Sequence, residues 1–206
     1  MPEIPRPRVG ILISGRGSNM VALVAAMNAG RVPADPVLVI SNVPDAPGLD
    51  TAAKLGIATA VVDHTAIKPR EAHERAVLAS LKQQRVDIVC LAGYMRRLSP
   101  LFVVAFRGRI LNVHPALLPA FPGLDAQKAA LEYGVKVAGC TVHLVDDELD
   151  HGPIVLQSTV PVEDGDTVEN LSARILVEEH ELYPRALALL ASGKLEIDGR
   201  RVRVRS

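Results

Sequence analysis

The first two thirds of this 206-residue chain alternate short apolar runs with segments of helical pattern. Continuous apolar runs of this kind are typical of strands in a parallel sheet that is covered on both faces. Strands are expected at 8–13, 36–41, 58–62, 86–91 and 109–113. Helices are expected between them, near 19–29, 47–55, 70–84 and 99–106. The alternation predicts an α/β fold built on an open, doubly wound, mostly parallel sheet.

The pattern changes in the C-terminal third. After the loop "PAFPGLD", a helix is expected at about 126–134, with Asp125 as its N-terminal cap and Gly134 at its end. Two strands follow in "GCTVHLV" and "IVLQSTVPV", and their short connection favours an antiparallel pair. A long helix at about 167–192 and a hairpin in "LEIDGRRVRV" complete the chain. We expect one continuous sheet with a distinct C-terminal third.

Composition excludes several classes of function. Lys plus Arg and Asp plus Glu both number 23, so the zero net charge gives no broad attraction for nucleic acid. No apolar run approaches membrane-spanning or signal-peptide character, which favours a cytoplasmic protein. Cys90 and Cys140 both lie inside apolar runs, so buried free thiols are expected rather than a disulfide or a metal site. We therefore expect no nucleic acid, no membrane and no metal among the partners.

A glycine-rich loop, "LISGRGSNM", follows the first expected strand and opens the first helix. Gly15 and Gly17 allow a tight turn close to a ligand, and the free N–H groups of a helix start favour an anion. The alternative is a plain turn capped by Ser18 or Asn19. Met20 stands where dinucleotide-binding loops carry Gly or Ala, and the second strand ends in "SN" rather than in an acid. The loop predicts a single phosphate on a small substrate, not NAD.

The segment "ILNVHP" places Asn112 and His114 on the same side of the fifth strand, because side chains alternate along a strand. Strand ends of this kind face the usual ligand crevice of an open α/β sheet. Taken singly, each residue has a structural explanation: the prolines around His114 hold it in place, and Asn112 is a turn former. The acidic loop "DDELDHGP" changes this interpretation, because one of its carboxylates can reach the imidazole, favour its charged form and orient it.

An amide N–H beside an imidazolium provides two donors for one developing oxyanion. No Ser or Cys nucleophile accompanies this pair in the sequence. The chemistry indicated is direct attack of a substrate's own nucleophile on a carbonyl, with the protein stabilising the tetrahedral intermediate.

Five segments in order, from about residue 8 to 190, resemble the glycinamide ribonucleotide transformylases: "LISGRGSN", "LAGYMRRLSP", "ILNVHPALLPAFPG", "GCTVHLVDDELDHGPIVLQ" and "EEHELYP". The Asn-x-His-Pro and Asp-x-Gly-Pro motifs are common to the wider formyltetrahydrofolate formyltransferases, and the glycine loop narrows the resemblance. It implies a Rossmann-like enzyme of purine biosynthesis. The enzyme would move a formyl group from its cosubstrate 10-formyltetrahydrofolate to the amine of glycinamide ribonucleotide, without a metal.

The resemblance also implies roles for single residues. Asn112, His114 and Asp150 would be the catalytic set, and Asp150 is chosen among the acids of its loop by its place before "GP". Glu179 would contact the glycinamide part of the acceptor, and the acceptor's phosphate would be held by Gly17, Ser18 and Asn19. Arg70 would meet the side of the folate. The folate pocket would be lined by Met95, Arg96, Arg97, Leu98, Asn112, Asp146, Asp147, Glu148, Leu149 and Asp150.

For Arg70 and Glu179 the sequence without the resemblance favours an ordinary solvated helix charge. The resemblance implies one domain over 1–206, in which 8–107 bind phosphate and nucleotide and 108–206 carry catalysis and folate binding. The sequence is compatible with a homodimer but indicates no oligomeric state.

One segment departs from the family pattern. After "FPGL" the family usually carries one or two histidines, whereas this chain has Asp125-Ala126-Gln127, which leaves the polar contacts near the folate open. His151, beside Asp150, is expected to be incidental to catalysis.

Three alternatives compete with this interpretation. A formyltetrahydrofolate deformylase would use water as the nucleophile, but such enzymes carry a further N-terminal domain, and the first expected strand begins within about ten residues of Met1. A methionyl-tRNA formyltransferase would need a longer chain with a basic C-terminal domain. A non-catalytic nucleotide-binding module is disfavoured by the intact Asn112, His114 and Asp150.

Overall fold

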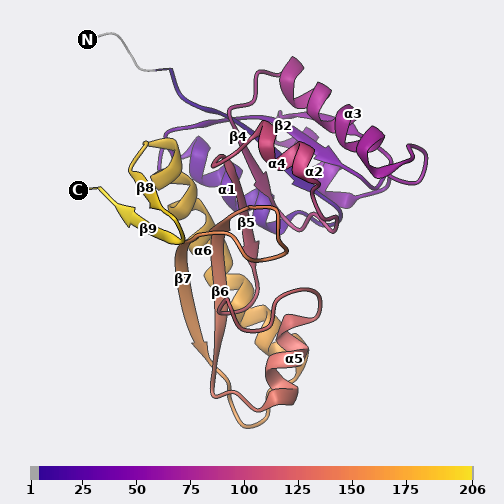
Figure 1. Cartoon of the computed structure of the whole chain (residues 1–206). Helices are drawn as coiled ribbons and strands as arrows, with labels where there is room; N and C mark the ends of the chain where they lie inside the picture. The colour runs from indigo at the N-terminus through magenta and orange to yellow at the C-terminus, as the bar shows by residue number, and fades with distance from the viewer. Residues whose placement is uncertain (1–4, 206) are drawn as a thin grey trace.

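Seven strands form the central sheet of the molecule (Figure 1): β1 (Arg8–Ile13), β2 (Asp35–Ser41), β3 (Ala58–Val61), β4 (Ile88–Leu91), β5 (Ile110–His114), β6 (Val137–Leu144) and β7 (Ile154–Pro161). The computed structural model describes residues 5–205. The strand order is β3-β2-β1-β4-β5-β6-β7. β1 to β5 pair in parallel, whereas β6 is antiparallel to both of its neighbours. The predicted mostly parallel sheet with antiparallel strands in the C-terminal third is confirmed.

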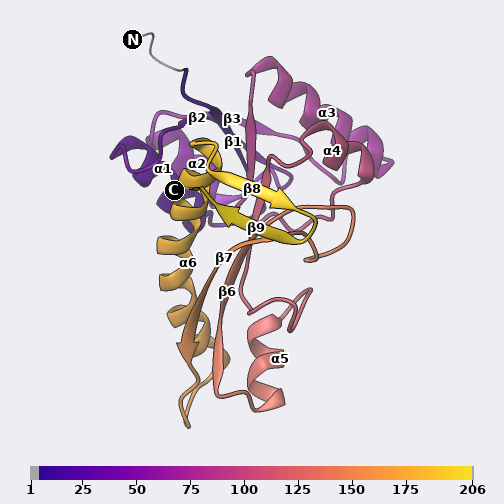
Figure 2. The ribbon, with the colours of Figure 1, turned by 60° about the vertical axis from the view of Figure 1, so that its left-hand side comes forward.

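Helices cover both faces of this sheet: α1 (Ser18–Asn28), α2 (Pro47–Lys54), α3 (Arg70–Gln83), α4 (Pro100–Ala105), α5 (Ala126–Tyr133) and α6 (Val168–Ala191). Buried side chains of α1, α2 and α6 join one apolar core, and those of α3 join a second, to which Phe102 of α4 also belongs. Figure 2 shows α1 and α6 on one side of the strands and α3 and α4 on the other. The expected doubly wound arrangement is therefore present.

The first strand shows how the sequence produces two cores. Val9 and Ile11 belong to the core under α1 and α6, while Leu12 belongs to the core under α3 and α4. Alternation of side chains along a strand sends neighbours to opposite faces. Gly10 is required for close packing, because a Cβ at this position would lie 2.6 Å from Cδ2 of Leu81 in α3.

The long helix α6 ties the C-terminal third to the centre of the sheet. It begins after Thr167, whose side-chain oxygen accepts the backbone N–H of Asn170 at 3.2 Å. The buried Tyr183 hydroxyl lies 3.2 Å from the carbonyl oxygen of Leu91 and 2.8 Å from that of Leu111. These bonds join α6 to β4 and β5 directly beside the strand end that carries Asn112.

A two-stranded hairpin, β8 (Leu195–Asp198) and β9 (Arg201–Val204), follows α6. Its turn contains Gly199 with φ of 58°, as the Asp198-Gly199 pair predicts. The hairpin crosses beside β7 and points its turn toward the loop between β6 and β7 (Figure 2).

Two local expectations needed correction. β5 extends one residue further than expected, so that His114 is its last residue rather than the first of the loop. Asp125 occupies the N-cap position of α5, but its side chain makes no capping hydrogen bond there. Its backbone is left-handed, with φ of 54°, whereas a capping side chain needs an extended backbone. The predicted capping role of Asp125 is therefore wrong.

Candidate active site

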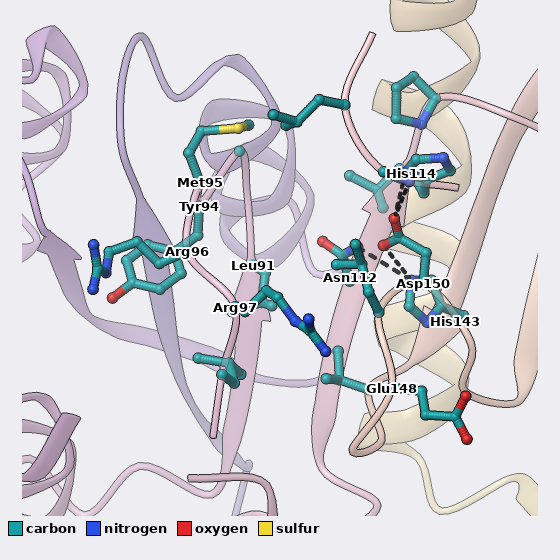
Figure 3. Close-up of a pocket in the computed structure, with 18 of the residues that line it drawn as sticks. Leu91, Tyr94, Met95, Arg96, Arg97, Asn112, His114, His143, Glu148 and Asp150 are labelled. Carbon is teal, nitrogen blue, oxygen red and sulfur yellow. Dashed lines mark hydrogen bonds and ion pairs between the residues drawn. The ribbon is translucent and has the colours of Figure 1, made fainter. Parts of the chain in front are cut away.

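A cavity of about 610 Å³ opens at the carboxyl ends of β4 and β5, where ligands of open α/β sheets usually bind. Three segments that are distant in sequence form most of its wall (Figure 3). They are the loop 93–98 after β4, the end of β5 and the loop 145–150 after β6. Polar side chains gather at the β5 end of this cavity, namely those of Asn112, His114, His143 and Asp150.

Antiparallel pairing brings two of these residues together. Asn112 of β5 lies opposite His143 of β6, and their Nδ2 and Nε2 atoms are 3.1 Å apart. The Nδ1 atom of His143 lies 2.9 Å from the carbonyl oxygen of Leu144. Nδ1 must donate to that carbonyl, so a neutral His143 has its lone pair at Nε2 and accepts a hydrogen bond from the Asn112 amide. The amide nitrogen of Asn112 is thereby oriented, and its second N–H is left for another partner.

His143 is only 2% exposed. Burial lowers its pKa below the usual range, although the Leu144 carbonyl and the Asp150 carboxylate act in the opposite direction. Asp150 Oδ1 lies 3.8 Å from His143 Nε2, a distance that would suit an ion pair. We assign the neutral form, because desolvation is the largest influence and the hydrogen bonds of both ring nitrogens are satisfied without a second proton.

His114 is held between two acceptors. Its Nε2 lies 2.8 Å from the carbonyl oxygen of Phe121, and its Nδ1 lies 3.4 Å from Oδ2 of Asp150. The side chains of His114 and Asp150 are 5% and 9% exposed, so this pair is largely removed from water. Nε2 donates to the Phe121 carbonyl, while the Asp150 carboxylate lies at ion-pair distance from Nδ1.

Asp150 is held by the loop that precedes α5. Its Oδ2 accepts the backbone N–H of Gly123 at 2.8 Å. The backbone of Asp150 is left-handed, with φ of 50°, a conformation that costs energy in a residue other than glycine. Gly152 follows in the same loop, and a Cβ there would lie 1.8 Å from the carbonyl oxygen of Leu144. The loop backbone is thus packed closely against the end of β6.

The glycine-rich loop after β1 forms a second candidate binding region, outside the lining of the cavity. Gly17 is the N-cap of α1 and is left-handed, with φ of 71°, and no side chain among the described residues caps this helix start. Asn19, in the first turn, donates from Nδ2 to Oε2 of Glu179 in α6 at 2.6 Å. Burial raises the pKa of Glu179 above its usual range, and the hydrogen bond from Asn19 opposes this rise. The loop therefore presents backbone N–H groups, while the Asn19 amide is turned to Glu179.

Residues 7–187 match the family model described as formyl transferase. The chain belongs to the formyl transferase family. The resemblance that the sequence motifs indicated is therefore confirmed.

Several relatives place the chain within this family. It is 43% identical to the phosphoribosylglycinamide formyltransferase of Escherichia coli K12, over 91% of this chain and 88% of the relative. A trifunctional purine biosynthetic protein adenosine-3 of Drosophila pseudoobscura pseudoobscura is 51% identical over 93% of this chain, but the chain spans only 14% of that protein's length.

Solved structures agree with the sequence comparison. A glycinamide ribonucleotide transformylase 1 of Symbiobacterium toebii superposes with a TM-score of 0.96 at 51% identity, covering 98% of this chain and 95% of that one. A formyltetrahydrofolate deformylase of Pseudomonas syringae has a TM-score of 0.89 at 25% identity, and this chain covers 67% of it. A transformylase and a deformylase thus both share this fold.

The residues predicted for the folate pocket come together in the cavity, with one exception. The loop 93–98 supplies Met95 to Leu98, and the loop after β6 supplies 146–150. In Figure 3, Arg96 and Tyr94 lie across the cavity from His114 and Asp150. The exception is Arg70, which lines a neighbouring hollow together with Arg96 and lies 3.8 Å from Glu74.

Other predicted residues lie as follows. Gly17, Ser18, Asn19 and Glu179 lie together at the start of α1 and outside the lining of the cavity. Asp125 and Gln127, which stand in place of the family's usual histidines, do line it. Asp146 is turned to His151, at 2.8 Å, rather than to His114.

His143 is the residue that sequence analysis missed. It stands in the quoted segment "GCTVHLV", two residues after Thr141 and on the same face of β6. Strand alternation places it on the same face as Thr141, but neither the pairing of β6 with β5 nor the register that sets it opposite Asn112 is visible in the sequence.

The two cysteines are free and buried, as expected. Burial raises the pKa of both Cys90 and Cys140 to about 12, so neither offers a thiolate nucleophile near neutral pH. Within residues 5–205, no group of three His, Cys, Asp or Glu side chains is arranged to hold a metal ion. None of the helices described is both long and apolar enough to cross a membrane.

Proposed function

We propose that this protein transfers the formyl group of 10-formyltetrahydrofolate to the amine of glycinamide ribonucleotide. The observation that carries the proposal is the cluster of Asn112, the buried His114 and Asp150 at one end of a cavity large enough for a pterin-sized ligand. The family relationship and the phosphoribosylglycinamide formyltransferases among the relatives support the same reaction.

The reaction proceeds by direct attack. The acceptor amine adds to the formyl carbon, and the formyl oxygen takes up the negative charge of the tetrahedral intermediate. Collapse breaks the bond from the formyl carbon to the folate nitrogen, which receives a proton, while the former amine loses one. The products are the formylated ribonucleotide and tetrahydrofolate, with no covalent enzyme intermediate.

Asn112 and His114 stabilise the oxyanion in this scheme. The second N–H of the Asn112 amide is free of His143 and is directed to the formyl oxygen. His114 contributes the positive charge of an imidazolium. Its Nδ1 lies 3.4 Å from Asp150, longer than the 2.7–2.9 Å that is usual for a charged hydrogen bond, so Nδ1–H is accessible to a substrate oxygen beside the pair.

The substrates would occupy the two places described above. The folate binds in the cavity between the loops 93–98 and 145–150, with Arg70 and Arg96 at the side. The phosphate of the ribonucleotide binds the N–H groups at Gly17 to Asn19, and Glu179 faces the glycinamide part. In this scheme 8–107 supply the phosphate site, 108–206 supply catalysis and most folate contacts, and 1–206 act as one domain.

A deformylase is the second candidate, because a deformylase shares the fold at 25% identity. The two functions are separated by incubating purified protein with 10-formyltetrahydrofolate, with and without glycinamide ribonucleotide, while folate absorbance and formate are measured. Folate turnover that starts only when the acceptor is added supports the transferase. Rapid formate release without the acceptor identifies the hydrolase, and no turnover in either mixture contradicts both.

A further inference from the structure

The loop that carries Asp150 is held on its inner side by the active site and on its outer side by a different contact. On the inner side, Asp150 meets His114 and the Gly123 N–H. On the outer side, His151 Nδ1 lies 2.8 Å from Oδ2 of Asp146, and this bond closes the loop between its two ends. His151 is therefore part of a second network in the same loop.

The C-terminal hairpin completes the outer network. Arg200, in the β8–β9 turn, donates from Nη2 to the carbonyl oxygen of His151 at 2.6 Å. Its Nη1 lies 2.8 Å from Nε2 of the same histidine. The guanidinium thus contacts both the backbone and the ring of His151, the residue that directly follows Asp150 in the chain.

The donors and acceptors of this network fit one arrangement. Nη1 of Arg200 lies 2.8 Å from Nε2 and 3.2 Å from Nδ1 of His151, so the guanidinium contacts the face of the ring, and the ring proton on Nδ1 is donated to Asp146. Asp146 in turn accepts the backbone N–H of Glu148 through Oδ1 at 3.0 Å. The chain of bonds runs from the hairpin turn through His151 and Asp146 into the middle of the loop.

We propose that Arg200 is a positioning residue, which holds the loop 145–153 in the conformation that keeps Asp150 against His114. The role in turnover rests on the proposed formyl transfer, whereas the effect on loop conformation does not. The hairpin lies beyond residues 7–187, the part of the chain that matches the family model.

Backbone geometry explains why this loop needs an external contact. Asp150 is left-handed, which disfavours the conformation when nothing holds it. At the next residues, Gly152 packs against Leu144 and the Leu144 N–H donates to the carbonyl of Pro153 at 2.9 Å, so the end of the loop is anchored. The segment between Asp146 and His151 is the part that Arg200 restrains.

The test compares two arginine variants of the same hairpin. Arg200→Ala removes both donors to His151. The control is Arg203→Ala, which removes a positive charge from β9; among the described residues, the Arg203 side chain has no hydrogen bond to the loop. Hydrogen exchange of peptides covering 146–151 is measured by mass spectrometry, together with kcat and KM for both substrates. We expect exchange to rise and kcat to fall about threefold to tenfold in Arg200→Ala only, with KM for the ribonucleotide unchanged.

A double-mutant cycle sharpens the assignment. In a His151→Ala background the backbone carbonyl remains but the ring is lost, so Arg200→Ala should cost less there than in the parent. Equal exchange in the Arg200→Ala and Arg203→Ala proteins overturns the proposal, and so does an unchanged kcat in an active enzyme whose loop exchange has risen. A parent protein without formyl transfer contradicts the proposed function instead, and the exchange measurement then still decides whether Arg200 restrains the loop.

Discussion

Two aspartate–histidine pairs lie at the two sides of one loop, and they differ mainly in their exposure to water. Asp150 and His114 form the inner pair at 3.4 Å, with side chains 9% and 5% exposed. Asp146 and His151 form the outer pair at 2.8 Å, with side chains 36% and 43% exposed. The shorter contact is the more exposed one. Distance alone therefore does not identify the pair that is suited to catalysis.

Burial gives the inner pair its different character. Charges in a water-excluded site interact through a low effective dielectric constant, whereas an exposed pair is screened and contributes little. The inner pair also borders the cavity next to Asn112, while the outer pair is joined to the C-terminal hairpin through Arg200. The comparison supports the proposal that Asp150 serves the chemistry, whereas Asp146 belongs to the outer network of the loop.

Asp150→Asn should have the largest effect. The asparagine keeps the size and an oxygen that accepts the Gly123 N–H, but the negative charge beside His114 is lost. By analogy with the aspartate of the serine-protease triad, turnover should fall by about 10³–10⁴ with little change in thermal stability. Steady-state kinetics and thermal unfolding of the purified variant check this. A loss smaller than tenfold would remove Asp150 from the catalytic set.

Asn112→Ala should follow with a loss of about 10²–10³ in kcat, because one of two oxyanion donors disappears. Asn112 borders the cavity and makes its side-chain hydrogen bond to His143, so folate binding should change less than kcat. The check is kcat and KM with saturating ribonucleotide. A variant whose KM for folate rises while kcat is retained would show that Asn112 binds the folate without stabilising the oxyanion.

His143→Leu should lower turnover by about tenfold, because the Asn112 amide loses the acceptor that orients it. In an Asn112→Ala background the same substitution should have almost no further effect on turnover, since the residue through which it acts is gone. Equal losses in the two backgrounds would mean that His143 acts on another group.

The same variant makes a prediction about pH. Burial lowers the pKa of His143 in the folded protein, so the unfolded chain binds a proton near pH 6.5 that the folded protein does not. Stability linked to this residue is therefore complete above pH 6.5 and is lost as the pH falls. Denaturant unfolding at pH 7.5 and 5.5 should show a smaller decrease in the free energy of unfolding for His143→Leu than for the parent. An identical decrease in both proteins would contradict a neutral buried His143.

The fold could be predicted closely from the sequence because each buried strand is a continuous apolar run between polar turns. Most strand and helix ends lie within one or two residues of their expected positions. The shared side of Asn112 and His114 also follows from strand alternation alone. Asp125 shows the limit of such reasoning, because its type suits a helix cap but its left-handed backbone turns the side chain elsewhere.

Contacts between distant segments could not be read from the sequence. Asn19 and Glu179 are 160 positions apart, and their hydrogen bond depends on how α1 and α6 pack together. The partner of Asn112 depends on the register between β5 and β6. Composition and spacing left four acids of one loop as equal candidates for His114. The resemblance selected Asp150, and the backbone geometry of the loop explains why Asp146 faces the other way.

Asp146→Asn should have the smallest effect and is the matched partner of Asp150→Asn. Both substitutions change the same residue type in the same loop and remove one negative charge. At the outer pair, Asp146 accepts the Glu148 N–H and the His151 Nδ1–H through different oxygens, so the asparagine keeps one of these bonds, while solvent replaces the other and screens the lost charge. Turnover should therefore stay within about threefold of the parent, since exposed ion pairs contribute about 0–1 kcal/mol.

Measuring both variants in one assay tests the comparison directly. If burial decides, the ratio of the two losses is at least about a hundredfold in favour of Asp150. Similar losses in both variants would show that the charge of the whole loop matters rather than its burial at one position. A larger loss for Asp146→Asn would identify Asp146 as the catalytic carboxylate. The charge that turnover needs would then belong to the outer pair, which has no close contact with His114.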